Sequence, residues 1–227
     1  DIHRLAARDR HVFAALMLAH GHGDGLVTGA TRKSAHVLER LNHVFDANAK
    51  HGAVGITALL HKGRIVFIGD TLVHEWPNEE DLANIAEKGA KVARHMGLEP
   101  RVAFVSFSTF GYPVSERAEK MQRAPDVLDA RGVDFEYEGE MTVDVALNAE
   151  SQKNYPFSRL TGPANILVVP ARHSASISVK LMQEMAGATV IGPILTGLDK
   201  SIQICSTTST ANDILNMAIL AACKVGE

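Results

Sequence analysis

Apolar residues along the chain follow two spacings that alternate from one end to the other. Helical spacing, in which apolar positions recur three and four residues apart, marks 7–20, 31–46, 79–96, 114–130, 174–186 and 210–223. Short apolar runs between these segments predict strands at 26–29, 54–60, 64–68, 101–108, 133–137, 165–169, 189–195 and 202–205. Strands that alternate with helices of this length form βαβ units. We therefore predict an α/β fold with mostly parallel sheets covered by helices on both faces.

Local signals refine several of these elements. Asn78 is a suitable N-cap, and the three acidic residues after it carry a charge that is favourable at the positive end of a helix. The glycine-containing triplet 61–63 predicts a hairpin between two strands. Pro125 is expected to bend or split its helix, because proline has no amide hydrogen. The acidic stretch 138–140 is expected to begin a loop-like region, in which the polar segment 148–163 is the best candidate for a flexible or functional loop.

Composition and charge argue against several classes of protein. The 23 Lys and Arg residues are outnumbered by 26 Asp and Glu, which argues against a nucleic-acid-binding protein with a basic face. No apolar run reaches the roughly 18 residues that a membrane span needs. The two cysteines, Cys205 and Cys223, cannot make a disulfide framework, so we expect a reducing, cytoplasmic setting.

The motifs of metal and nucleotide sites are also missing. Eleven histidines are present, but none of them form an H-E-x-x-H motif or a paired ligand set with a carboxylate, including those at 20, 22, 36, 43, 51 and 61. We expect satisfied surface or core histidines rather than a metal site. The chain has no P-loop, no complete G-x-G-x-x-G after a strand and no G-x-S-x-G, which disfavours a kinase, a Rossmann enzyme and an α/β-hydrolase.

Ligands in open α/β sheets bind beyond the carboxyl ends of the strands, so the loops that follow the strands are the candidate sites. The segment 206–213, of sequence STTSTAND, is the most informative, because it places several hydroxyls and free amide groups at a helix start. Such a loop can hold an anion or a pyrophosphate, and Asp213 could act as a base or hold a partner. Thr210 and Asp213 also have the spacing of an ordinary capping box, and both interpretations stay open.

Three other loops have a similar character. The segment 106–111 could line a polar pocket or form a simple turn, and 170–176 adds a cation, Arg172, that could contact a phosphate. The segment 25–34 places Arg32 and Lys33 at a helix start, where an anionic ligand would explain two unfavourable positive charges.

Longer motifs resemble a known family. The runs NILVVP at 165–170, KLMQEMAGA at 180–188 and IGPILTGLDK at 191–200 resemble the C-terminal half of phosphate acetyltransferases. Upstream segments agree in order, namely DGLVTGA at 24–30, EEDLANIA at 79–86, SFS at 106–108 and GEMTVD at 139–144. The resemblance covers essentially the whole chain.

This resemblance implies two three-layer α/β/α subdomains with a cleft between them, as a homodimer or a higher homo-oligomer. Residues 1–55 together with 197–227 would form the first subdomain, around an inserted second subdomain at 56–196. The family's N-terminal segment would then lie upstream of Asp1, which fits a chain that begins without methionine.

The chain resembles more closely the acetyltransferase-like C-terminal domain of hybrid, MaeB-type NADP-dependent malic enzymes. The segments that carry this likeness are YPFSRLTGPAN at 155–165, HSASIS at 173–178 and NDILNM at 212–217. The resemblance implies a sensor domain that binds acetyl-CoA or CoA, attached to a catalytic malic-enzyme domain. NADP and a divalent metal would belong to that upstream domain alone.

One position separates this chain from active acetyltransferases. The resemblance places Ser206 near the acyl centre and Asp213 as the base for the CoA thiol, but Thr207 stands where the family has an arginine that holds acetyl phosphate. A second family arginine aligns near Glu39-Arg40. Loss of a bidentate, permanently charged clamp weakens phosphate binding, whereas an acyl thioester needs no cation at its acyl end.

We therefore expect a regulatory domain that binds acetyl-CoA without transferring its acetyl group. The expected ligand-binding positions are Ser206, Thr207, Asp213 and Asn216 at the acyl and thiol end, with Ser108, Arg159, Arg172 and His173 as further candidates. The alternatives are an active phosphate acetyltransferase and an oligomerisation scaffold.

Overall fold

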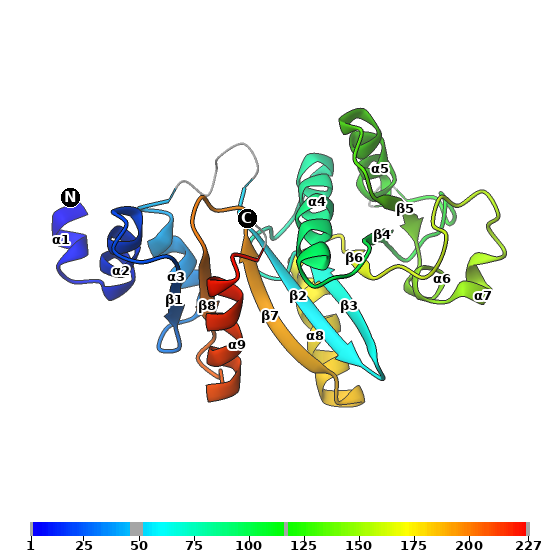
Figure 1. Cartoon of the computed structure of the whole chain (residues 1–227). Helices are drawn as coiled ribbons and strands as arrows, with labels where there is room; N and C mark the ends of the chain where they lie inside the picture. Colours follow the sequence, from blue (N-terminus) through cyan, green and yellow to red (C-terminus); the bar gives the residue numbers. More distant parts are fainter. Residues whose placement is uncertain (1, 46–51, 116–117, 226–227) are drawn as a thin grey trace. The chain divides into compact units, whose positions relative to one another are not determined.

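Strands and helices alternate along the whole chain in the computed structural model, which describes residues 2–45, 52–115 and 118–225 (Figure 1). The chain divides into two compact units. Unit 1 comprises Asp1–Gly55 and Ile191–Glu227, and unit 2 comprises Ile56–Val190. Some predicted positions lie outside the described residues. They are residue 46, where one helix was expected to end, residues 116–117 of another expected helix, and His51.

Unit 1 contains a pair of parallel strands, β1 (Leu26–Gly29) and β8 (Ile202–Cys205). Both strands contact helix α9, and β1 also contacts α2 and α3. Asp9 caps α2, because its carboxylate accepts hydrogen bonds from the amides of His11 and Val12. The helices of this unit are α1 (Ile2–Ala6), α2 (Arg10–Ala19), α3 (Ser34–Leu41) and α9 (Ala211–Ala222).

The strands of unit 2 lie in one sheet in the order β5-β4-β6-β3-β2. β4 pairs in parallel with β5 and β6, and β6 pairs in parallel with β3. β2 and β3 form the expected antiparallel hairpin, with His61 opposite Arg64. The strands are β2 (Val54–His61), β3 (Arg64–Gly69), β4 (Arg101–Val105), β5 (Glu136–Met141) and β6 (Ile166–Val168). The strand β7 (Thr189–Thr196) belongs mostly to unit 1, which resumes at Ile191.

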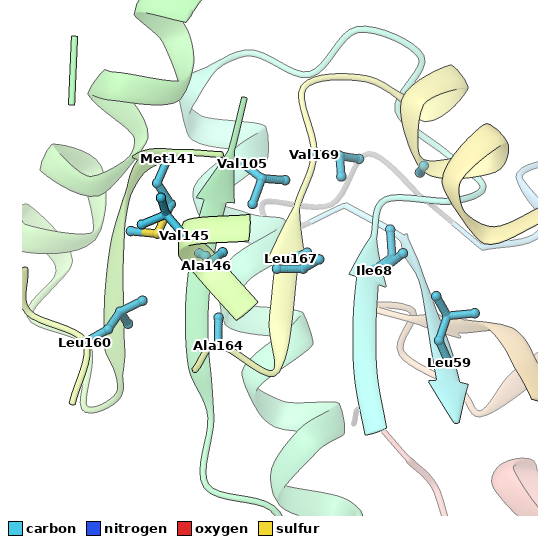
Figure 2. Packing of buried hydrophobic residues seen from close by; sticks show 12 residues of the cluster. Leu59, Ile68, Val105, Met141, Val145, Ala146, Leu160, Ala164, Leu167 and Val169 are labelled. Carbon is cyan, nitrogen blue, oxygen red and sulfur yellow. The ribbon is translucent and has the colours of Figure 1, made fainter. Parts of the chain in front are cut away.

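Helices cover both faces of this sheet. On one face, α4 approaches β6 so closely that a Cβ on Gly89 would lie 2.9 Å from the Ile166 side chain. On the other face, Leu167 joins the apolar cluster of Figure 2, to which α8 contributes Ala175 and α6 contributes Val145. Neighbouring residues of one strand point to opposite faces, so β6 is buried on both. The helices are α4 (Glu79–His95), α5 (Glu119–Arg131), α6 (Val143–Leu147), α7 (Ala149–Gln152) and α8 (Arg172–Ala186).

The α/β alternation with mostly parallel sheets is confirmed, one local expectation is corrected, and the structure gives detail on two others. The stretch 138–140 is not the start of a loop but the centre of β5, where Glu138 and Glu140 are buried. The segment 148–163 contains the short helix α7. Pro125 does not split α5, which begins only at Glu119 and continues through the proline to Arg131.

Terminal signals account for the best-defined helix. Asn78 and Asp81 form a capping box at the start of α4, and Arg94 and His95 occupy its last turn. Within the part of the chain that the structure describes, every helix is too short or too polar to span a bilayer.

Candidate functional site

Two of the candidate loops begin side by side in unit 1, at the carboxyl ends of β1 and β8. Gly29 lies opposite Cys205 in the ladder, and the amide of Ala30 donates to the Cys205 carbonyl at 3.0 Å. A Cβ on Gly29 would lie 2.2 Å from that carbonyl oxygen, so the close approach requires glycine. The parallel pairing therefore brings the loop 30–33 and the loop 206–210 to one edge of the sheet.

The Ser206 hydroxyl organises the turn after β8. It accepts a hydrogen bond from the Thr208 amide at 3.2 Å and lies 2.9 Å from the Thr208 hydroxyl. The Ser209 hydroxyl donates to it at 3.4 Å. Thr207, which is predicted to stand where the family has an arginine, is exposed in this turn. Residues 206–210 therefore form a short turn that is rich in hydroxyls and contains no cationic side chain.

Thr210 and Asp213 form a capping box at the start of helix α9, in which Thr210 is the N-cap. The Oδ2 of Asp213 accepts from the Thr210 amide at 2.7 Å and from the Thr210 hydroxyl at 2.9 Å, while the Asp213 amide donates to Thr210 Oγ1 at 3.2 Å. The capping interpretation is thus confirmed, and a role for Asp213 as a base stays a prediction. Half-buried Asn216 is three residues further, on the same side of the helix. Burial, and then the charge of Asp213, raise the pKa of the Cys205 thiol.

Cations gather near the carboxyl end of β1. His11 is 3% exposed, and its Nδ1 lies 2.7 Å from the Thr28 hydroxyl. Burial lowers the pKa of His11, and the positive charges of Arg10 and Arg32 lower it further, against the opposing effect of Asp9. Arg10 also hydrogen-bonds the Thr31 side chain. This edge of unit 1 therefore combines hydroxyls with positive charge, the chemistry expected of an anion-binding loop.

Ser108 lies in unit 2, directly after β4. Its side chain is fully buried, and its hydroxyl has no hydrogen-bond partner among the described residues. A buried hydroxyl without a hydrogen bond lowers stability by about 1–3 kcal/mol, so a ligand or water that bonds to it would be favourable. The neighbouring residue Thr109 bonds across to Thr142 at the end of β5.

Arg159 is engaged with carboxylates at the edge of the same unit. Its guanidinium donates to Asp129 at 2.7 Å and to Glu138 at 3.4 Å, and lies 4.6 Å from the ring centroid of Tyr137. Burial and the hydrogen bond to Asp129 raise the pKa of Tyr137 to about 12. Two carboxylates neutralise the charge of Arg159 in this arrangement, and its ligand contact stays a prediction.

Arg172 and His173 lie in the first turn of α8 rather than in the loop before it, because the helix begins two residues earlier than expected. Arg172 donates to the Leu72 carbonyl at 3.1 Å and lies 3.6 Å from the Glu75 carboxylate. The His173 ring is 4.9 Å from that of Trp76. Both residues therefore contact the loop that follows β3.

That loop contains a polar network which the sequence analysis did not identify. The buried carboxylate of Asp70 accepts hydrogen bonds from the Leu72 amide at 2.7 Å and from the amide and Nδ1 of His74, each at 2.8 Å. The hydrogen bond to Asp70 raises the pKa of His74, and Asp81 adds to the effect from 3.8 Å. The sequence signal for this network is an aspartate that directly follows a buried strand and precedes a histidine by four residues.

The loops at the carboxyl ends of the strands are the candidate sites. Among the described residues, no three His, Cys, Asp or Glu side chains lie close enough to hold a metal ion. An open hollow of about 900 Å³ is lined by Arg64, Asp144 and Pro163, among others. It lies near the amino ends of β3 and β6, opposite the end at which α/β sheets bind ligands.

The fold and the loops at its strand ends define a phosphotransacetylase-like protein. The structure matches the EutD phosphotransacetylase from Staphylococcus aureus with a TM-score of 0.85 at 26% identity, over 95% of this chain and 67% of that one. A phosphotransacetylase from Streptococcus pyogenes matches with a TM-score of 0.88 at 27% identity, over 96% and 68%. The chain belongs to the phosphate acetyl/butaryl transferase family, whose model matches residues 1–222.

Curated relatives indicate the branch of the family. The chain is 50% identical to the NADP-dependent malic enzyme of Rhizobium meliloti over 226 residues, which are 100% of this chain but 30% of that protein. The phosphate acetyltransferase of Bacillus subtilis is 28% identical, over 97% of this chain and 69% of that protein. The chain is thus homologous to the phosphotransacetylase-like domain of NADP-dependent malic enzymes and spans about a third of their length.

Proposed function

We propose that this chain is the regulatory domain of an NADP-dependent malic enzyme and that it binds acetyl-CoA, or CoA, as an allosteric effector. The observation that carries the proposal is the match to 30% of a malic enzyme at 50% identity. In the whole protein, NADP and a divalent metal would bind to the malic-enzyme part, which oxidatively decarboxylates malate to pyruvate. The unpaired thiols of Cys205 and Cys223 support a cytoplasmic location.

The Ser206 turn supports ligand binding without acetyl transfer. Ser206 and Asp213 occupy the family positions at the acyl centre and the thiol, and Asn216 follows on the same helix face. Thr207 offers a hydroxyl where the resemblance expects a guanidinium. Removing one donor aimed at charge in a transition state costs about 10²–10³ in rate. A thioester is uncharged at its acyl end, so its binding does not need this clamp.

Calorimetric titration of the 227-residue chain with acetyl-CoA tests the proposal, with Asn216→Ala as the variant that should weaken binding. Absence of binding at millimolar acetyl-CoA would contradict it. In the longer protein, malate and NADP should change acetyl-CoA affinity by the same factor by which acetyl-CoA changes theirs, because coupling of binding free energies is reciprocal.

An active phosphate acetyltransferase is the second candidate, favoured by the retained Ser206 and Asp213. Formation of acetyl phosphate and CoA from acetyl-CoA and phosphate distinguishes the two. We expect the wild-type rate to be low and Thr207→Arg to raise it, because the substitution restores a phosphate-binding cation. A brisk wild-type rate that Thr207→Arg leaves unchanged would favour the enzyme.

Exposed apolar side chains support assembly of the domain into a homodimer or a larger homo-oligomer. Ile177, Leu181 and Met185 follow one another at helical spacing on α8, and all three are exposed. Ile219 on α9 is exposed as well. If the domain is only an oligomerisation scaffold, replacing these residues should abolish assembly and leave the response to acetyl-CoA unchanged. Sedimentation of a Leu181→Glu variant, together with its acetyl-CoA titration, separates the two roles.

A further inference from the structure

We propose that the carboxyl edge of the unit 2 sheet binds a nucleotide, with the base stacked on Trp76 and a phosphate held by Lys120. The proposal concerns unit 2 alone and does not depend on the regulatory function. It identifies the ligand by its chemistry, a flat aromatic base with a negative charge. A free nucleotide and the nucleotide portion of a larger coenzyme share that chemistry.

The topology makes the loops diverge at this edge. From β4 the chain turns into α5, which packs against α4 on one face of the sheet. From β6, the neighbour of β4, it turns into α8, whose Ala175 packs on the opposite face with α6. Where adjacent parallel strands send their connections to opposite faces, the loops diverge, and open α/β sheets bind ligands there.

Trp76 provides an aromatic surface beside this position. It is the chain's one tryptophan, lies in the loop after β3, and is 69% exposed. Its ring is positioned by its neighbours, since the His173 ring lies 4.9 Å away at 56° and the Lys120 ammonium lies 5.8 Å from the ring centroid. An indole held in place but left largely in water is typical of a surface that stacks on a ligand.

Lys120 supplies a cation at the same place. Its ammonium donates to the Pro77 carbonyl at 3.1 Å and to the Pro170 carbonyl at 2.9 Å, which joins the loops after β3 and β6. An ammonium has three protons, so one remains for a ligand. Burial lowers the pKa of Lys120, and the negative charge of Glu79 opposes this effect. The buried hydroxyl of Ser108, without a partner among the described residues, follows the adjacent strand β4.

The start of α8 fits an anion at this edge. No side chain caps its N-terminus, and its first turn carries Arg172 and His173 with no acidic residue. By contrast, α4 and α9 each have a carboxylate in a capping box. Arg172 is already paired with the Glu75 carboxylate, so the feature that favours an anion here is the uncapped, positive end of the helix itself. Together with the indole of Trp76 and the ammonium of Lys120, this helix end favours a ligand that is both aromatic and negative.

Tryptophan fluorescence, excited at a wavelength that tyrosine does not absorb, tests the proposal directly, because Trp76 is the one tryptophan of the 227-residue chain. We expect ADP to quench this fluorescence and to bind by calorimetry. Trp76→Ala should weaken ADP binding about tenfold or more, and Trp76→Phe should retain most of the affinity, because a benzene ring still stacks. Phe13→Ala, which removes another exposed aromatic ring from unit 1, is the matched control and should change nothing.

Separate ligands resolve the two parts of the site. Lys120→Gln should weaken binding of ADP but not of adenosine, a difference that a merely structural role for the lysine would not produce. Titration with CoA then shows whether the nucleotide portion of a coenzyme occupies the same surface. No quenching by ADP at millimolar concentration, or equal ADP affinity of wild type and Trp76→Ala, would overturn the inference. In either case acetyl-CoA binding could still be measured by calorimetry, so the regulatory function is judged separately.

Discussion

Replacement of Gly29 by alanine should destabilise the edge where the loops after β1 and β8 meet. The added Cβ would lie 2.2 Å from the Cys205 carbonyl oxygen and 3.0 Å from its nitrogen, and both are backbone atoms that cannot rotate away. Gly29 also has a φ of 109°, a conformation that side chains other than glycine rarely adopt.

The expected loss of stability combines two destabilising effects and one smaller compensating effect. Forcing alanine into such a backbone conformation costs about 1–3 kcal/mol. Overpacking against a fixed neighbour adds about 1–3 kcal/mol. The lower entropy of the unfolded alanine chain returns about 0.4–1 kcal/mol. We therefore expect Gly29→Ala to lower the free energy of unfolding by about 1–6 kcal/mol.

Urea unfolding followed by circular dichroism measures this difference, with Gly21→Ala as the control. Gly21 belongs to the same unit and has a φ of 78°, but a Cβ there would meet nothing within 4 Å. Its substitution should cost about 1 kcal/mol, since only the backbone strain applies. Equal destabilisation by the two substitutions would refute the close approach of β1 to Cys205.

Two further substitutions test local interactions. Thr210→Ala removes the cap of α9 and should lower the free energy of unfolding by about 1 kcal/mol. Thr210→Ser keeps the hydroxyl, so chemical unfolding should show a smaller loss of stability for this variant. Equal losses for the two variants would contradict the capping box. His74 has a raised pKa in the folded state, chiefly through its hydrogen bond to Asp70, so its stabilisation is complete below its unfolded pKa of about 6.5 and is lost as the pH rises through the folded value. His74→Gln should therefore lower the Tm more at pH 5.5 than at pH 9, and a pH-independent difference in thermal unfolding would argue against the charged pair.

Terminal signals and periodicity were enough to predict most elements, because they act within one turn or one strand. The cap at Asn78 and the acidic first turn of α4 are examples, and the capping spacing of Thr210 and Asp213 was recognised as one of two interpretations. The expectation failed at β5, where Glu138 and Glu140 sit in a buried strand. A charged residue is tolerated there because Arg159 and the Gly111 amide satisfy the two carboxylates, and both partners are distant in sequence.

The sequence alone determined the α/β class, the family resemblance and the loops in which a ligand site should be sought. Those conclusions depend on periodicity, capping residues and motifs, which are all read from short segments of the chain. Only the tertiary structure decided which loops share an edge, that Arg159 is already paired with carboxylates, and that Trp76 lies between His173 and Lys120. Such contacts join strands and helices separated by tens of residues, and they arise from the pairing order of the sheet, which no short motif specifies.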